Sequence, residues 1–211
     1  NAEVFNDLHN IKIKSDITTF IYSNEFFDAF GSKQYIHQNK EFNEIKIKKI
    51  NNKYKLVYEE NLISAHLKEK YSNYNFEEKD ILEHSILIDN FLFQLKEKLN
   101  NNFFFSTTDY GYFKLPKKST LRLISNHKKV NLFEEFENID YSFDVNFEYI
   151  KDNFMSFNPK VISQKELIKN FLNENIYSEN KDMINKTVDM LGGTKFENMG
   201  NHFLNISFYA L

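Results

Sequence analysis

The chain has 211 residues, a formal net charge of −3 and no cysteine. Its length suffices to bury a sizeable core, and a hydrophobic share of 41% beside 27% charged residues is typical of a folded globular protein. The missing cysteine excludes disulfides, thiolate nucleophiles and cysteine-ligated metal centres. It also slightly favours an exported or cell-surface protein over a cytoplasmic one.

The cationic residues are almost all lysine. Arg122 is the only arginine beside 26 lysines, and asparagine occurs 29 times, a usage that suggests an AT-rich, low-GC bacterial genome. Because bidentate recognition of phosphate is mainly an arginine task, nucleic-acid binding is disfavoured. No apolar stretch approaches the ~20 residues of a membrane span. The start at Asn1 instead of Met leads us to expect the remnant of a cleaved expression tag or the edge of a trimmed chain.

The first predicted elements are short. Turn residues and brief alternating runs predict a helix over 3–10, strands over 11–14 and 18–22, and one or two helical turns over 24–30.

A β-hairpin gives the first clear pattern. Residues 44–50 and 53–58 alternate between apolar and polar side chains, and Asn51-Asn52 lies between them. Asparagine tolerates the positive φ of a type I′ turn, so this pair predicts a hairpin. The side chains expected on its buried face are Ile45, Ile47, Tyr54 and Leu56.

A core helix is predicted over residues 77–99. Apolar side chains recur there at spacings of three and four residues, from Ile81 to Leu99. Acidic residues at the start and Lys96 and Lys98 at the end complement the helix dipole.

Aromatic residues are concentrated between Phe103 and Phe157, which holds 14 of the chain's 35. Aromatic side chains favour strands and bury large areas, so this stretch predicts the core of the fold. Its alternating runs predict an antiparallel meander with strands over 103–107, 112–115, 120–125, 141–150 and 154–157. The first two strands are expected to flank a turn at 109–111.

The C-terminal part is expected to be helical before a last strand. Ser163 and Glu166 have the spacing of a capping box and predict a helix over 166–172. A second helix is predicted over 179–191 and a strand over 202–211, which pairs with an earlier strand.

The predicted fold class is α+β. We expect a single domain over 1–211, with an antiparallel, meander-like sheet of about five to seven strands and two to four helices packed mainly on one face. A sub-boundary near 158–162 would set off the C-terminal helical segment and the final strand.

Two groups of residues are candidates for function. Asp80 and His84 are four residues apart on the predicted helix, which would place a carboxylate beside an imidazole for metal or acid–base work, with Glu83 as an accessory group. An ordinary interaction on a helix face explains this spacing better. Tyr110 and Tyr112, beside Asp109 and around Gly111, could present rings to a sugar, a base or a peptide.

The acid–base, metal and nucleophile patterns are weak throughout the sequence. We therefore expect a non-enzymatic binding or protein-interaction module without a cofactor or a bound metal, whose partner is an unknown protein or small molecule. The first alternative is a metal-dependent hydrolase or nuclease that uses Asp80 and His84. The second is a fragment of a larger multidomain protein.

Overall fold

The structure is a computed structural model that describes residues 8–11, 13–14, 16–60, 65–99, 102–126, 128–133, 138–174, 186 and 202–210. The contacts divide the chain into two compact units. Unit 1 comprises Asn1–Ala29, Ile88–Lys114 and Asp144–Leu211, and unit 2 comprises Phe30–Leu87 and Leu115–Phe143. The expectation of a single domain stays a prediction.

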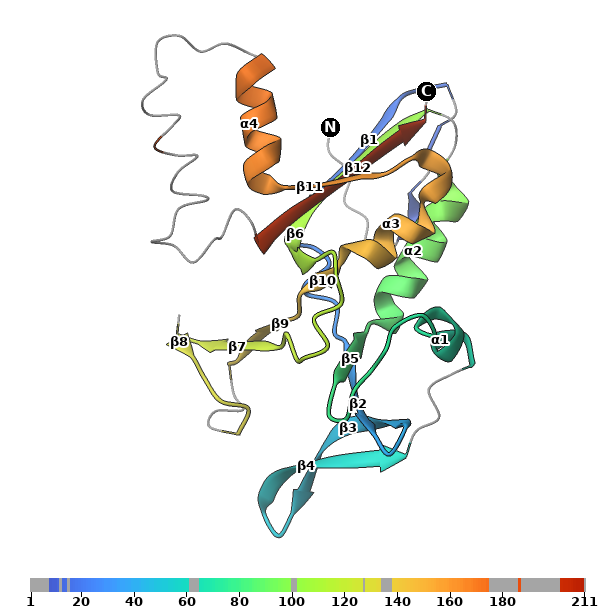
Figure 1. Cartoon of the computed structure of the whole chain (residues 1–211). Coiled ribbons are helices and arrows are strands. Elements are labelled where there is room, and N and C mark those ends of the chain that lie inside the picture. Colours follow the sequence, from blue (N-terminus) through green and yellow to red (C-terminus); the bar gives the residue numbers. More distant parts are fainter. Residues whose placement is uncertain are drawn as a thin grey trace. The chain divides into compact units, whose positions relative to one another are not determined.

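Unit 1 is built on a five-stranded mixed sheet. Its strands, in the order β1-β6-β12-β11, with β10 also paired to β6, are β1 (Thr19–Asn24), β6 (Phe103–Tyr112), β12 (Phe203–Ala210), β11 (Lys160–Ser163) and β10 (Val145–Asn146). Strands β1 and β10 run parallel to β6, whereas β12 runs antiparallel to β6 and β11 antiparallel to β12 (Figure 1). The prediction of an antiparallel meander is therefore only partly right, although the C-terminal strand does pair with an earlier one.

Strand β6 forms the centre of this unit. Phe103, Phe105 and Asp109 are buried on one of its faces, as the two-residue period of a strand requires. On the same face, Phe208 of β12 stacks against Phe105 with 4.7 Å between ring centroids and against Phe154 at 4.5 Å. The aromatic stretch thus forms a core, but the predicted turn at 109–111 is wrong because β6 continues through it.

The helical elements of unit 1 are η1 (Leu8–Asn10), α2 (Ile86–Lys98), α3 (Phe147–Asn153), η2 (Met155–Phe157) and α4 (Gln164–Glu174). Helix α3 contacts β6, β11 and β12, and it begins where Asn146 Oδ1 accepts a hydrogen bond from Tyr149 N at 3.0 Å. The predicted strands over 141–150 and 154–157 are therefore wrong for most of their length. The predicted helix over 166–172 is confirmed, and Ser163 Oγ caps it through Glu166 N at 3.1 Å.

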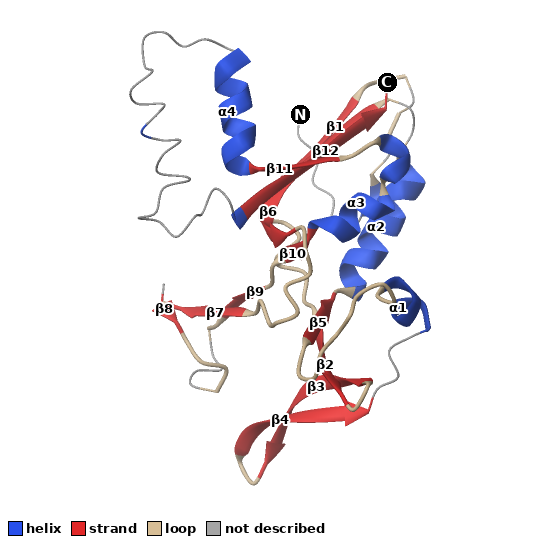
Figure 2. Cartoon of the chain, viewed as in Figure 1, coloured by secondary structure: helices blue, strands red, loops and turns tan. Residues whose placement is uncertain are grey.

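Unit 2 consists mainly of strands, with α1 (Ala65–Lys70) as a short helix (Figure 2). One antiparallel sheet has the order β4-β3-β2-β5, with β2 (Lys33–Gln38), β3 (Glu41–Ile50), β4 (Lys53–Glu60) and β5 (Ile81–His84). A three-stranded sheet has the order β8-β7-β9, with β7 (Arg122–Ser125), β8 (Lys128–Lys129) and β9 (Asp140–Ser142). Tyr35, Leu67, Tyr71 and Leu82 form the buried core.

The predicted hairpin is confirmed as β3 and β4. Asn51 and Asn52 have φ values of 50° and 59°, as the type I′ turn requires. Its predicted buried face is wrong, because Ile47, Tyr54 and Leu56 are each more than 40% exposed. The core contacts of the hairpin come from the start of β3, where Phe42 packs against the core cluster, so the end near the turn covers little core.

The predicted helix over 77–99 divides into two elements. Residues Ile81–His84 form β5, paired with β2, and the helix begins only at Ile86. The four-residue spacing between Ile81 and Ser85 matches a helix, but both residues precede the helix, so this match was coincidental. The helix predicted over 179–191 lies outside the described residues, apart from the isolated residue 186. In the described part of the chain, no helix is long and apolar enough to cross a membrane.

Candidate functional site

The parallel strands β1 and β6 run toward the same edge of the sheet in unit 1, and β6 continues to Tyr112 beyond the end of β1. Asn24, the last residue of β1, lies opposite Thr108, and Glu25 N donates a hydrogen bond to Thr108 O at 3.0 Å. Glu25 then takes a φ of 48°, in the left-handed region that side chains other than glycine rarely adopt. In α/β sheets, ligands bind beyond the carboxyl ends of parallel strands, which makes this edge the candidate site.

Asp109 ties the two strand ends together. Its Oδ2 accepts hydrogen bonds from Phe26 N at 3.0 Å, Phe27 N at 2.8 Å and Asp28 N at 3.2 Å, and its Oδ1 accepts one from Tyr110 N at 2.8 Å. Three successive amides that converge on one oxygen form an anion-binding concavity. The carboxylate of this same chain fills it, so Asp109 holds the segment that leaves β1.

The pKa of Asp109 is raised to about 6, first by burial and then by the nearby charge of Asp28. The hydrogen bonds from the backbone of Phe27, Asp28 and Tyr110 oppose this shift because they favour the charged form. Burial has the larger effect on this side chain, which has no exposed surface.

An acid, an imidazole and a phenol meet at the same edge. Asp144 directly precedes β10, whose Val145 lies opposite Gly111, and His202 directly precedes β12, whose Phe203 lies opposite Tyr110. His202 Nε2 is 3.3 Å from Asp144 Oδ1, and the rings of His202 and Tyr110 are 5.8 Å apart between centroids. The His202 side chain is 43% exposed, whereas that of Asp144 is only 11% exposed. A buried carboxylate thus holds an imidazole that solvent can reach.

The first group of sequence-predicted residues lies at this edge. Asp109 is buried, and Tyr110 and Tyr112 are half-buried in β6, not in an exposed turn. The ring of Tyr110 packs on Phe203 with 3.8 Å between centroids. The role of these three residues as a contact surface for a ligand stays a prediction.

The second group lies in unit 2 and does not form a cluster. Asp80 precedes β5 and His84 ends it, so an extended strand of about 13 Å separates them. Asp80 Oδ2 accepts a hydrogen bond from Glu77 N at 2.8 Å, and His84 is buried with its Nδ1 3.5 Å from the Tyr71 hydroxyl. Glu83 accepts a hydrogen bond from Thr120 N at 2.9 Å. No group of three His, Asp or Glu residues suited to a metal ion occurs within the described ranges.

Sequence reasoning missed Asp28, Asp144 and His202 as residues of the edge. Asp144 and His202 are distant in the sequence, and only the pairing of β10 and β12 with β6 brings them together. No local spacing signals such a pair.

The mixed sheet of unit 1, with its parallel and antiparallel strand pairs, and the helices beside it define an α/β protein. Residues 4–157 match the model of the family described as "Putative S-adenosyl-L-methionine-dependent methyltransferase", and the chain belongs to this family. No curated protein matches the sequence.

Two crystal structures from Burkholderia thailandensis share the fold. One is an uncharacterized protein, with a TM-score of 0.70 and 15% identity, and it covers 92% of this chain. The other is described as a "likely methyl transferase" bound to S-adenosyl-homocysteine, with a TM-score of 0.69, 16% identity and the same coverage. The chain spans 55% and 54% of the lengths of these two proteins.

The family match corrects the functional prediction from the sequence. A non-enzymatic binding module is the wrong class, and so is a metal-dependent hydrolase or nuclease, because the family consists of methyltransferases by its description. The five glycines of the sequence do not form a glycine-rich cofactor motif between a strand and a helix, so no local pattern indicated a methyltransferase.

The described residues alone do not fit the complete methyl donor. Gly31 and Gly111 are the glycines in the described part of the chain, and neither belongs to a glycine-rich loop. The space beside Gly111 is filled, since a Cβ there would meet the Val145 carbonyl oxygen and lie 2.6 Å from the Phe147 ring. The oxygens of Asp109 already accept four backbone hydrogen bonds. These residues therefore do not form a full cradle for an adenosyl group.

Proposed function

We propose that the chain acts in S-adenosyl-L-methionine-dependent methyl transfer, and that the edge at the ends of β1 and β6 faces the methyl acceptor. The observation that carries this proposal is the convergence of His202, Asp144 and Tyr110 at that edge. The family match supports the class of reaction.

His202 is the group that can accept a proton from the acceptor. Methylation of an N–H or O–H group leaves a proton to be removed, and a histidine imidazole is a common general base for such a step. Asp144 Oδ1 lies 3.3 Å from Nε2, where it orients the ring. Asp144 is mostly buried but His202 is 43% exposed, so solvent screens this interaction in part.

Asp109 acts as a positioning residue for the same edge. Its hydrogen bonds fix the main chain from Phe26 to Asp28 and so fix where Asn24 and Glu25 leave β1. The left-handed φ of Glu25 and its hydrogen bond to Thr108 add to this constraint. A rigid edge of this kind suits a reaction that depends on close alignment of its groups.

Photolabelling tests the location. The full chain is irradiated with S-adenosyl-L-methionine labelled in its methyl group, and the labelled peptides are identified. We expect label in peptides that contain residues 24–29, 109–113, 144–149 or 202–204, because the methyl group must lie beside the acceptor at this edge, and we expect excess S-adenosyl-L-homocysteine to remove it. The proposal would be contradicted if the label were confined to peptides of unit 2, or if S-adenosyl-L-homocysteine removed none of the label.

A further inference from the structure

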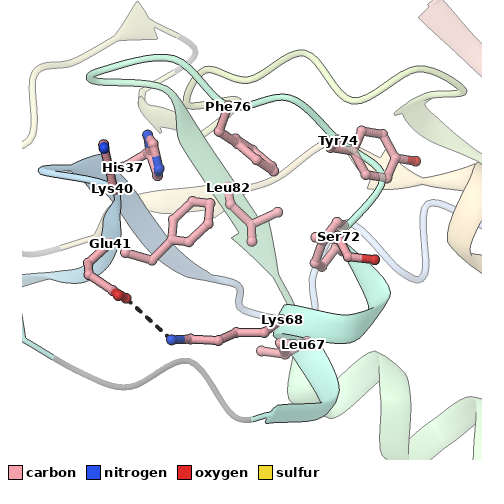
Figure 3. A pocket seen from close by; sticks show the side chains of 11 residues that line it. His37, Lys40, Glu41, Leu67, Lys68, Ser72, Tyr74, Phe76 and Leu82 are labelled. Carbon is pink, nitrogen blue, oxygen red and sulfur yellow. Dashed lines mark hydrogen bonds and ion pairs between the residues drawn. The ribbon is translucent and has the colours of Figure 1, made fainter.

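Unit 2 contains a pocket of about 240 Å³ that the proposed methyl-transfer edge does not use (Figure 3). Its floor consists of Leu67 and Leu82, which belong to the buried core of the unit. Its residues come from β2, β3, α1, β5 and the segment between α1 and β5. The pocket is therefore part of the folded core and not a gap between surface loops.

Aromatic rings line the walls of the pocket. Phe42 and Phe76 pack edge to face with 4.9 Å between centroids and 84° between planes, and Tyr74 lies 6.3 Å from Phe76. All three are half-buried, so each is held in place and still reaches the cavity. Such rings favour a flat aromatic ligand that can stack or meet them edge to face.

The volume fits one ring system with a substituent. An apolar cavity of about 150 Å³ is known to accept benzene. A pocket of about 240 Å³ has room for a larger ring or for a ring with a short polar arm.

The rim of the pocket carries an excess of positive charge. Among the lining residues, Lys40 and Lys68 are cationic and Glu41 is the acid. Glu41 Oε2 is 3.3 Å from Lys68 Nζ, drawn as the dashed line in Figure 3, so this pair neutralises itself. The charge of Lys40 remains and favours an anionic group at the rim.

The position of Lys40 is fixed by its turn. Asn39 and Lys40 connect β2 to β3 with φ values of 53° and 66°, and Asn39 N donates a hydrogen bond to Glu78 Oε2 at 3.1 Å. A two-residue turn of this type prefers asparagine or glycine at both places. Lysine is the less favourable choice for the turn itself, and it places a cation at the pocket.

We propose that this pocket binds a planar aromatic ring bearing one acidic group. The ring lies against Phe42, Tyr74 and Phe76, and the acidic group faces Lys40. This site is independent of the His202–Asp144 pair, so either proposal can fail without the other.

Indole-3-acetate is a suitable probe, and indole-3-acetamide is its neutral counterpart. The chain contains no tryptophan, so indole fluorescence anisotropy reports the ligand without a protein signal of the same kind. We expect the full chain to bind indole-3-acetate up to about fivefold more tightly than the amide, as one partly exposed ion pair allows.

Two variants separate charge from ring contacts. Lys40→Asn removes the cation while favouring the turn, and it should abolish the preference for the acid but leave amide binding unchanged. Phe76→Leu should weaken both probes, with circular dichroism to verify folding. Lys53→Asn, beside the turn of the β3–β4 hairpin, is the matched control and should change nothing. The proposal would be overturned if the wild type bound the acid and the amide equally or bound neither probe. It would also be overturned if Lys53→Asn reduced the preference for the acid as much as Lys40→Asn does.

Discussion

The Asp109 carboxylate of β6 accepts a hydrogen bond from Phe27 N at 2.8 Å, across 82 residues of sequence. Phe26 and Asp28 donate to the same oxygen, so one side chain holds the whole turn that leaves β1. This contact joins the segment that follows β1 to β6 just beyond Thr108, the last β6 residue paired with β1, and the geometry of the candidate site depends on it.

We expect Asp109→Asn to destabilise the chain. Both carboxylate oxygens accept backbone hydrogen bonds, whereas an asparagine has one acceptor oxygen, so either orientation of the new side chain leaves at least one buried amide facing a donor and should cost about 1–3 kcal/mol of unfolding free energy. Urea denaturation measures this loss. Asp140→Asn, at an exposed position of β9, is the control and should change stability by no more than about 0.5 kcal/mol. A similarly small change in unfolding free energy for Asp109→Asn would mean that the hydrogen bonds of Asp109 contribute little to stability.

The raised pKa of Asp109 predicts a pH dependence of stability. Its pKa is about 6 in the folded chain against an ordinary 3.8, so the folded state binds the proton more tightly. Asp109 therefore contributes stability that is fully present below about pH 4 and is lost as the pH rises through 6.

The charge of Asp28 contributes to this shift, so Asp28→Asn should lower the pKa of Asp109. The variant should gain stability relative to the wild type at pH 7, and this gain should shrink below pH 6, where Asp109 is protonated in both. Unfolding free energies at several pH values test this. A difference between variant and wild type that stays constant from pH 7 to pH 4 would exclude the repulsion.

Gly111 should not tolerate a side chain. A methyl group there would meet the Val145 carbonyl oxygen and the Phe147 ring, which pack against β6. Gly111→Ala should cost about 1–3 kcal/mol or more, because the strand pair with β10 must move. Gly31→Ala is the matched control, since a Cβ there has nothing within 4 Å. Thermal unfolding measures the melting temperature of each variant. Equal melting temperatures would show that β10 can move away from the added methyl group at little cost in stability.

The parts of the fold that were predictable are those with local signals. The turn at Asn51-Asn52 and the cap at Ser163 depend on residues close in sequence, and both are confirmed. Residues 141–150 alternate well but form β9, β10 and the start of α3, because Asn146 caps a helix within the run. Tertiary packing outweighed the alternation there.

The candidate site was only partly predictable. Asp109, Tyr110 and Tyr112 stood out because aromatic residues surround a glycine, and they do lie at the edge where the parallel strands end. The predicted setting of these residues, a turn, was wrong, because the parallel pairing of β1 with β6 cannot be deduced from the sequence of either strand alone. His202 and Asp144 have no local pattern at all, and they meet only through β10 and β12.

Methyl transfer itself tests the central claim most directly. The full chain is incubated with S-adenosyl-L-methionine carrying a tritiated methyl group and a heat-treated cell extract as the source of acceptors, and the transferred label is counted. We expect transfer by the wild type, a loss of about 100-fold or more in His202→Gln, a clear loss in Asp144→Asn, and no change in the control Asp140→Asn. No transfer by the wild type, or undiminished transfer by His202→Gln, would contradict the account.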